Sequence, residues 1–529
     1  MRTKNIIFII LTLAVVHLTT SCKKDLLNTP PNDRLSSEVF WRSENDAKLA
    51  VNAIYPFLDS TNIISWDGLT DIGHTNQFFT NDALVERGVY DATNPKIAGE
   101  WNYAYKGIAA ANYFLDNVDK VQTTNTALIN QLKGEARTLR AYQYIKLASF
   151  FGDVPLVTKT INIEEGRNLT RTPVAQIWDF VDKELSEAAA VLPVSYAATE
   201  KGRVSKGAAL ALQARANLFA GRYQQAADAA KKVMDLNVYS IYPQYAKLFT
   251  YAAENNAEVI LDKEYIKDVY PTNIFAFLAP YSQKGSGTAN WVVPTKKLVD
   301  LYPMSNGKDI ADPSSGFDPA NPYTNRDPRL RFSIFVPGDI LPDGKIFNPL
   351  PNSGTPDAIG STFYATSTGF TIKKYINNED YANINNSGIN IILLRYAEVL
   401  LTYAEAKIEL NQIDQSVYDA INKVRQRSDV NLPPLTGLSQ SQLQDAVRKE
   451  RTIELAFEGL RLFDIRRWKI AESVISGPVQ GITYNAGGQL TTVQVQAFEK
   501  VFNSTRDYLW PIPQKEKELN SKLTQNTGW

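Results

Sequence analysis

The sequence predicts a mainly α-helical protein, in which paired helices form a scaffold and a loop-rich insert region with short strands packs on it. Two observations support this fold class. Apolar residues recur at steps of three and four in several segments, which is the spacing of one face of an α-helix. Between about residues 237 and 388, by contrast, Pro, Gly, Asn, Asp and Tyr dominate, as is typical of loops and small strands. The chain has 529 residues and is 44% hydrophobic, so it can bury a large core.

The first 21 residues are predicted to be a lipoprotein signal peptide. Arg2 and Lys4 precede an apolar run, residues 6–18, which has the length of an export signal and is too short to span a membrane comfortably. Small residues follow, and then Cys22, the only cysteine in the chain. This arrangement resembles a bacterial lipobox, in which the cysteine carries a lipid; an incidental cysteine beside an ordinary cleavage site is the alternative. The polar residues 22–37 are expected to form a lipid-anchored tether.

The folded body is expected to begin near residue 38, and its N-terminal part, residues 38–236, contains three helical patterns. The first places apolar residues on one face of a helix over 141–151. The second is capped by Thr172, begins at Pro173 and ends before Pro193, and we expect it to pair with the first. The third covers 209–219 and 226–233, two helices whose small residues allow close approach. This hairpin resembles a tetratricopeptide unit.

The C-terminal part, residues 389–529, repeats this plan. Helical spacing covers residues 396–410 and 417–424, with a turn near Asn411 between them. Because helix pairs of this kind cannot bury their own apolar faces, several must stack, and we expect a right-handed, solenoid-like scaffold. The insert region, residues 237–388, separates the two halves of this scaffold. Recognition residues usually lie on such inserts.

Five motifs in the chain are similar to those of the SusD/RagB family of outer-membrane nutrient-binding lipoproteins. They are Gly134-Glu135-Ala136-Arg137 leading to Phe151-Gly152-Asp153-Val154-Pro155-Leu156, Asn325-Arg326-Asp327-Pro328-Arg329, Arg395-Tyr396-Ala397-Glu398, Arg448-Lys449-Glu450-Arg451 leading to Arg466-Arg467-Trp468, and Tyr508-Leu509-Trp510-Pro511-Ile512-Pro513. The resemblance implies a SusD-like fold with tetratricopeptide-like helices, a place on the extracellular face of the outer membrane, and no enzymatic activity. It also implies capture of a glycan or similar nutrient and its delivery to a SusC-like TonB-dependent transporter.

Two other classes of protein stay open. Glu450, Glu454 and Glu458 fall at steps of four, and paired carboxylates are the acid and base of a glycoside hydrolase. A structural ion-pair network is the competing interpretation, because arginines are interspersed among these glutamates and can neutralise them. The arginines are Arg448, Arg451, Arg461, Arg466 and Arg467. The other class is a tetratricopeptide adaptor that binds protein segments.

Scarce residue types exclude much metal and thiol chemistry. One cysteine and two histidines, His17 and His74, are too few for disulfide scaffolds, structural zinc sites or most histidine-based triads. Loss of the signal peptide would leave 54 basic and 56 acidic side chains, so we expect no nucleic-acid partner. We expect no cofactor. A structural calcium ion at Asp309, Asp312 and Asp318 competes with the interpretation of that segment as a turn-rich loop.

The ligand-binding residues are predicted by elimination. A sugar needs a flat apolar ring against its C–H face and polar groups for its hydroxyls. Most of the tryptophans fall in helical or family-motif segments, whereas Trp66 and Trp291 fall in insert-like loops. We hypothesise that these two loops converge on the ligand site; the alternative is that either ring packs on the scaffold. Polar or aromatic residues near the two rings complete the predicted site: His74, Asn76, Tyr281 and Asn290.

Overall fold

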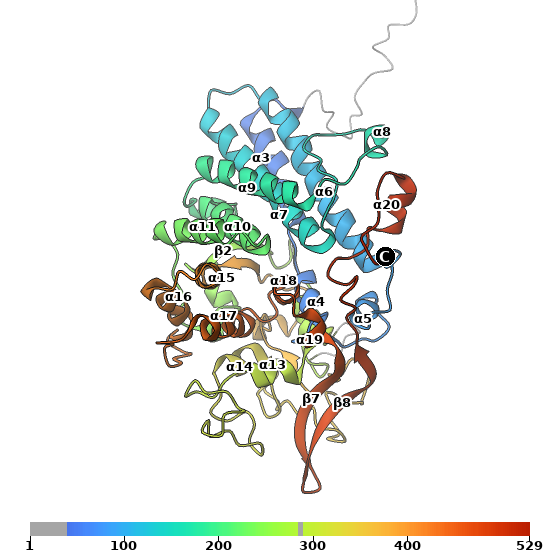
Figure 1. Cartoon of the computed structure of the whole chain (residues 1–529), viewed down its shortest axis with the longest axis vertical. Coiled ribbons are helices and arrows are strands. Elements are labelled where there is room, and N and C mark those ends of the chain that lie inside the picture. Colours follow the sequence, from blue (N-terminus) through green and yellow to red (C-terminus); the bar gives the residue numbers. More distant parts are fainter. Residues whose placement is uncertain (1–39, 284–288) are drawn as a thin grey trace, which may run out of the picture.

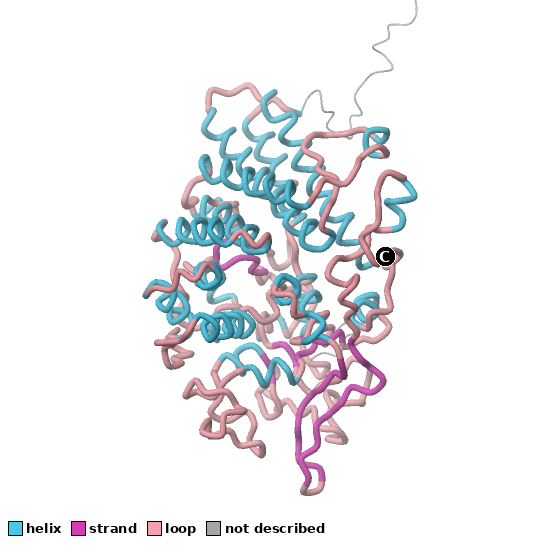
Figure 2. The backbone as a smooth tube through the Cα atoms, viewed as in Figure 1, coloured by secondary structure: helices cyan, strands magenta, loops and turns pink. Residues whose placement is uncertain are grey.

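The computed structural model describes residues 40–283 and 289–529 (Figure 1). The signal peptide predicted for residues 1–21, the anchor at Cys22 and the tether over 22–37 lie outside the described residues and stay predictions. Helices form most of the regular structure, and the described strands are mostly short (Figure 2). The predicted fold class, mainly α-helical with a loop-rich region, is therefore confirmed.

The longer helices form a continuous stack. They are α3 (Glu44–Asn52), α6 (Pro95–Asn117), α7 (Thr126–Phe151), α9 (Val174–Val191), α10 (Lys206–Phe219), α11 (Tyr223–Asp235), α15 (Tyr396–Glu409), α16 (Gln415–Arg425) and α17 (Gln440–Glu454). Helix α6 packs on α7, α7 on α9, α9 on α10, α10 on α11, α11 on α15, and α15 on α16 and α17. The predicted pairing of α7 with α9 and the two predicted helical hairpins, α10–α11 and α15–α16, are thus confirmed (Figure 1).

Small residues allow the helices in the middle of this stack to pack closely. Helix α10 is buried along almost its whole length, and its alanines allow α9, α11 and α15 to approach it. Its one buried cation, Arg215, donates two hydrogen bonds to the Glu398 carboxylate of α15 (2.7 and 2.6 Å). The two halves of the scaffold, separated by more than 150 residues of sequence, are therefore joined in one core.

The predicted N-terminal cap of α9 is wrong. Thr172 lies in a β-bridge with Val154, and the carboxylate of Asp153 accepts the hydrogen bond from the Val174 N–H (2.7 Å). The chain excursion between α7 and α9 returns to the start of α9, so a residue 21 positions earlier supplies the cap. Spacing along the sequence cannot reveal a cap supplied from so far away.

The remaining elements are shorter and lie mainly in the loop-rich region and near the C-terminus. The helices are α4 (Asn62–Gly68), α5 (Asn81–Glu86), α8 (Ile163–Gly166), α12 (Ile274–Leu278), α13 (Lys296–Leu301), α14 (Arg329–Ser333), α18 (Arg461–Arg467), α19 (Ala471–Ile475) and α20 (Gln514–Leu519). The strands form four antiparallel pairs: β1 (Gly73–Thr75) with β3 (Val292–Pro294), β2 (Val259–Lys263) with β6 (Ile391–Arg395), β4 (Ile334–Phe335) with β5 (Thr371–Ile372), and β7 (Gly477–Ala486) with β8 (Gln489–Lys500).

The β7–β8 hairpin projects away from the helices, at the bottom of Figure 1. Its lower half has few neighbours, but the middle of β7 is fixed to the loop-rich region, because the Ile482 N–H donates to the Thr368 carbonyl (2.7 Å). At Gly481 the two backbones are so close that a Cβ would overlap this carbonyl group. The hairpin is therefore held in one position against the loop that contains Thr368.

A buried ionic cluster joins the C-terminal helices to the loop-rich region. Its members, all buried, are Glu258, Asp327, Glu450, Glu454 and Glu458 with Arg329, Lys374, Arg395, Arg425 and Arg427. Glu454 lies at the centre: it accepts from Arg395 and Arg427 (both 2.7 Å) and from Arg329 (2.8 Å). Burial alone would raise the pKa of Glu454, but these arginines hold it well below its usual value. The carboxylates and cations balance, so the cluster carries no net charge.

The ion-pair interpretation of Glu450, Glu454 and Glu458 therefore fits the structure, but the expected arginine partners were wrong. The arginines interspersed in sequence project elsewhere: Arg451 and Arg467 contact Asp464 and Glu405, Arg461 contacts Asp71, and Arg448 contacts Glu409. Residues one position apart on a helix point about 100° away from each other. The glutamate face of α17 consequently meets cations from other segments of the chain.

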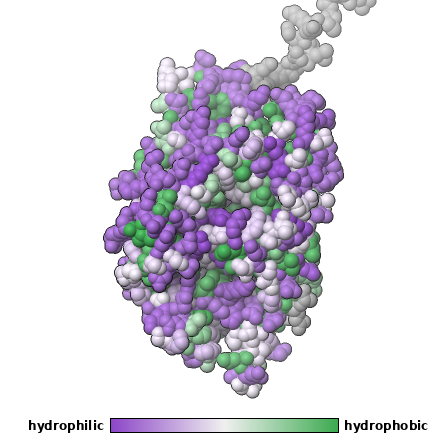
Figure 3. Space-filling model, in the orientation of Figure 1, coloured by the Kyte–Doolittle hydropathy of each residue, from purple (hydrophilic) through white to green (hydrophobic). Residues whose placement is uncertain are grey.

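The face of the molecule in Figure 3 is mostly hydrophilic, with hydrophobic residues in small, separate areas. Across residues 40–283 and 289–529, no helix combines the length and the apolar character that crossing a bilayer requires.

Candidate functional site

The two segments predicted to converge do lie side by side. Strand β1 pairs with β3, which places His74 opposite Val293, and the Asn76 N–H donates to the Trp291 carbonyl (3.1 Å). A third segment joins them, since the Asn290 side chain donates to the Tyr364 carbonyl (2.9 Å). Residues far apart in the sequence thus form one wall of the loop-rich region.

This wall and the β8 strand enclose a cavity of about 740 Å³, which we call the β8 cavity. Its lining residues are His74, Asn76, Phe78, Arg87, Pro351, Ile359, Gly360, Thr362, Phe363, Ala365, Ser367, Val493, Gln494, Val495 and Phe498. The volume is within the range of small-molecule sites in proteins. Two of the predicted site residues, His74 and Asn76, are among those that line it.

Exposed phenylalanine rings mark the rim of the β8 cavity. Phe78 is 53% exposed, Phe79 61% and Phe363 67%. The rings of Phe78 and Phe363 lie 5.9 Å apart between centroids, and those of Phe78 and Phe79 5.6 Å. Leaving such a side chain in water forgoes about 1.5–3 kcal/mol of burial free energy, and contiguous exposed apolar groups usually mark a binding surface. The rim therefore has the character of an apolar platform beside a partly polar cavity.

His74 is part of the cavity wall and is held in place by buried partners. Its Nδ1 lies 2.8 Å from Glu86, and the same carboxylate also accepts from the Thr75 N–H (3.0 Å) and pairs with Lys500 (2.6 Å). Burial alone would raise the pKa of Glu86, but His74 and Lys500 lower it below its usual value. The ring of His74 also packs edge-on against Phe498 (4.4 Å between centroids). His74 is thus fixed by the core on one side and faces the cavity on the other.

The side chain of Asn76 links two segments of the cavity wall by hydrogen bonds. Its amide donates to the Ala365 carbonyl (3.0 Å) and accepts from the Ser367 N–H (2.9 Å), which ties the 73–76 segment to the 362–367 loop. The hydroxyl of Ser367 lies in the same wall, is buried, and has no hydrogen-bond partner among the residues that the structure describes. A buried hydroxyl without a partner is costly, so the hydrogen bonding of this part of the wall is incomplete.

The prediction that Trp66 lies in a loop at the ligand site is wrong. Trp66 is part of α4 and is 3% exposed. Its indole N–H donates to Glu100 (2.8 Å), and its ring packs edge-on against Phe150 and Phe463. The apolar residues around Trp66 form a helix face, so its ring belongs to the core of the protein.

The other predicted residues lie behind the cavity wall and do not line it. Asn290 is fully buried and is held by Tyr364 and Thr371 (2.8 Å), so its role is structural. Trp291 is partly buried and stacks on Phe277 (5.6 Å between centroids). Tyr281 stacks on Tyr364 (5.8 Å). Asn290 and Tyr281 thus contact Tyr364, and the residue before it, Phe363, reaches the rim.

The search for binding residues among the tryptophans missed the aromatic residues that the structure places at the cavity. The signal was present as Phe78-Phe79 inside the polar run from Asn76 to Asn81, and as Phe363 in a loop rich in Gly, Ser and Thr. Large apolar residues in such polar surroundings cannot join a regular helix or strand face. Restricting the search to tryptophan excluded them.

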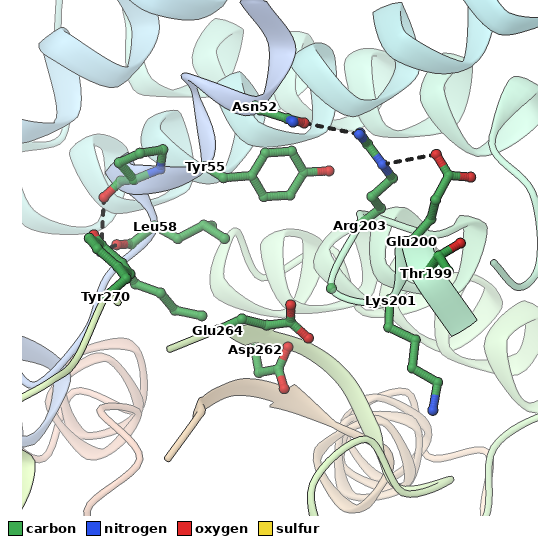
Figure 4. A pocket seen from close by; sticks show the side chains of 13 residues that line it. Asn52, Tyr55, Leu58, Thr199, Glu200, Lys201, Arg203, Asp262, Glu264 and Tyr270 are labelled. Carbon is green, nitrogen blue, oxygen red and sulfur yellow. Dashed lines mark hydrogen bonds and ion pairs between the residues drawn. The ribbon is translucent and has the colours of Figure 1, made fainter. Parts of the chain in front are cut away.

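Figure 4 shows another cavity, of about 450 Å³, between the N-terminal helices and β2. Many of its polar groups are already paired. The Arg203 side chain points to Asn52 (3.0 Å) and Glu200 (3.6 Å), and Lys263 donates to backbone carbonyls. One exposed ring borders it among the described lining residues: Tyr270, which is 49% exposed and stacks on Tyr265 (5.4 Å between centroids), whereas three phenylalanine rings that are each more than half exposed mark the rim of the β8 cavity. The β8 cavity is therefore the better candidate for ligand binding.

The loop with Asp309, Asp312 and Asp318, for which calcium was the alternative to a turn-rich loop, is held together by its own hydrogen bonds. Asp312 accepts from the Ser314 N–H (2.7 Å), Asp318 accepts from the Ala320 N–H (2.9 Å), and Asp309 pairs with Lys449. Hydrogen bonds from these turns lower the pKa of Asp312 and of Asp318. Within the described part of the chain, no group of three or more His, Cys, Asp or Glu side chains is arranged to hold a metal ion.

Comparison with known proteins places this chain in one family. A sequence model of the SusD family matches residues 257–529, and a model described as "Starch-binding associating with outer membrane" matches residues 38–218. The solved structure of a SusD-like carbohydrate-binding protein from Bacteroides fragilis superimposes with a TM-score of 0.85 at 31% identity, and covers 92% of this chain and 100% of that one.

Two further relatives agree with this placement. Another SusD-like protein from Bacteroides fragilis has a TM-score of 0.82 at 27% identity, over 95% of this chain and 100% of that chain. SusD-like protein P25 from Formosa agariphila is 25% identical over 539 residues, 97% of each chain. The chain therefore belongs to the SusD family of carbohydrate-binding proteins that associate with the outer membrane.

Proposed function

We propose that this protein captures glycans in the β8 cavity at the cell surface and delivers them to a SusC-like TonB-dependent transporter, without cleaving them. The observation that carries this proposal is the exposed platform of Phe78 and Phe363 beside a cavity whose lining includes the polar residues Asn76, Thr362 and Gln494. An aromatic ring covers the C–H face of a sugar, while neighbouring polar groups bind its hydroxyls. The carbohydrate-binding relatives support the choice of ligand class.

The arrangement of carboxylates favours capture over hydrolysis. A glycoside hydrolase needs two carboxyl groups on either side of the scissile bond. No Asp or Glu is among the described residues that line the β8 cavity. Glu450, Glu454 and Glu458, the candidates for such chemistry, are buried in the ionic cluster and bound to arginines and Lys374. We therefore propose a binding protein, held on the extracellular face of the outer membrane by a lipid on Cys22.

Alanine substitution of the two rim rings tests the binding site. The variants F78A, F363A and F78A/F363A should bind a glycan of the wild-type repertoire more weakly, with at least a tenfold rise in Kd for the double variant, which corresponds to about 1.4 kcal/mol. Both rings are more than half exposed, so the melting temperatures should stay within about 1 °C of the wild type. Tyr113→Ala, at an exposed aromatic residue on α6, is the matched control.

The binding assay should use isothermal titration calorimetry of residues 23–529 against a panel of polysaccharides. Unchanged affinity of the double variant would refute the site, and release of reducing sugars by the wild type would favour the hydrolase. Peptide binding without glycan binding would favour the adaptor. Delivery to a transporter is tested separately: a large barrel protein should co-purify with the full-length chain from native membranes, and its repeated absence would contradict that part of the proposal.

A further inference from the structure

The β8 cavity has an uncompensated positive charge. Among the described residues that line it, Arg87 is the one permanently charged side chain, and no carboxylate faces it there. The guanidinium of Arg87 lies over the ring of Phe498 (5.7 Å to the centroid) and makes no ion pair or side-chain hydrogen bond within the described part of the chain. Arg203, in the cavity of Figure 4, is instead bound to Glu135 (2.9 Å) and Glu200.

The acidic residue adjacent in sequence does not neutralise Arg87. Glu86 points the other way, into the core, where it is 2% exposed and shared by Lys500 and His74. Its negative charge is therefore already balanced by Lys500, and its second oxygen is occupied by the Thr75 N–H. The field inside the cavity thus comes mainly from Arg87, reduced by water but without a fixed counter-ion.

Neutral hydrogen-bonding groups occupy the facing wall. Thr362 and Gln494 line the cavity together with Arg87 and Phe363. An arginine presents a planar fork of N–H groups that matches the two oxygens of a carboxylate or the oxygens of a sulfate. The cavity therefore combines an anion-binding group, neutral polar residues and an apolar platform.

We propose that the β8 cavity is specific for anionic saccharides. In the bound state, a sugar ring lies on Phe78 and Phe363, and its carboxylate or sulfate group pairs with Arg87. This inference rests on the proposed function, because it names the class of glycan that the same site takes. A neutral glycan uses the platform but leaves Arg87 without a counter-ion, so it binds less tightly.

Matched pairs of oligosaccharides isolate the charge from the sugar backbone. The carboxylate arm compares oligogalacturonates with their fully methyl-esterified forms, and the sulfate arm compares sulfated galactan oligosaccharides with their desulfated forms. Calorimetric Kd values are measured for the wild type at low and high salt. At least one anionic oligosaccharide should bind tenfold or more tightly than its neutral counterpart, and salt should weaken that preference. The arm in which the preference occurs identifies the anionic group.

Substitutions at Arg87 test whether this residue causes the preference. R87A should reduce the charge preference to less than threefold, and R87K should retain part of it. R87M keeps an apolar stem over Phe498, so it serves if R87A lowers the melting temperature. Arg42→Ala is the control, since Arg42 is exposed beside α3 and its removal changes the net charge equally. This variant should keep the wild-type preference.

The outcomes separate the inference from the proposed function. Binding of neutral and anionic partners with equal affinity, or an undiminished charge preference in both R87A and R87M, overturns the inference. If F78A/F363A then still loses affinity for the neutral oligosaccharide, the proposed function stands without it. Absence of binding to every oligosaccharide and to the polysaccharide panel counts against both.

Discussion

Neutralising Glu454 should destabilise this protein strongly without changing ligand binding. Glu454 is fully buried and accepts from three arginines, Arg329, Arg395 and Arg427, at 2.7–2.8 Å. The substitution Glu454→Gln keeps the size and shape of the side chain but removes its charge. The ionic cluster would then contain one more cation than anions, in a region that water does not reach.

The expected magnitude follows from breaking a buried ion pair by removing one partner. Such changes typically cost about 3–5 kcal/mol, because the remaining charge stays buried without compensation. At about 2.1 cal/mol/K of unfolding entropy per residue, a cooperative unit of this size should lose roughly 3–5 °C in Tm. Glu187→Gln is the matched control: Glu187 pairs with Arg137 on the surface, where ion pairs contribute about 0–1 kcal/mol.

Calorimetry and urea titration of E454Q and E187Q measure how much Tm and unfolding free energy each variant loses. The Kd for a bound glycan should stay at the wild-type value in E454Q, because the cluster does not line the β8 cavity. An E454Q protein as stable as E187Q would refute the argument that the cluster is balanced and buried. A loss of glycan affinity at unchanged stability would instead place Glu454 in the binding machinery.

Three further predictions concern the core, a buried acid and the hairpin. Trp66→Ala should cost about 3–5 kcal/mol and leave glycan affinity unchanged, as denaturant titration and calorimetry can check. Burial, together with Glu264, raises the pKa of Asp262 to about 7, so between pH 4 and 7 the folded protein binds this proton and the unfolded chain does not. The contribution of Asp262 to the free energy of unfolding therefore falls as pH rises through that window. The free energy of unfolding of D262N relative to the wild type should rise by about 2–4 kcal/mol from pH 5 to pH 8. Equal dependence of stability on pH in the two proteins would contradict this. Gly481→Ala should detach the β7–β8 hairpin, seen as faster hydrogen exchange at Ile482, because its Cβ would overlap the Thr368 carbonyl.

The helical scaffold could be predicted from the sequence because it depends on local spacing. Apolar residues at steps of three and four define α7, α9 and both helical hairpins, and each pattern reports a face that must be buried. The turn at Asn411 is equally local, since this residue adopts a positive φ of 55°. The family motifs were visible for the same reason, because each is a short contiguous run.

The candidate site could be predicted only in part. The sequence indicated that the segments around His74 and Trp291 belong together, and β1 does pair with β3. It could not tell a buried ring from an exposed one, so Trp66 was assigned to the surface and the exposed Phe363 was missed. Whether an aromatic ring meets solvent depends on what packs over it, and that covering comes from residues distant in sequence.

The sequence by itself determined the helix pairs, their stacking and the family of this protein. The tertiary structure alone decided which charges meet: Glu454 is bound by arginines 27, 59 and 125 residues away, while the nearby Arg451 pairs with Asp464. It also decided that Arg87 has no ion-pair partner among residues 40–283 and 289–529, because the adjacent Glu86 is directed into the core and held by Lys500. Electrostatic pairing depends on distance in space, whereas helix formation depends on spacing along the chain.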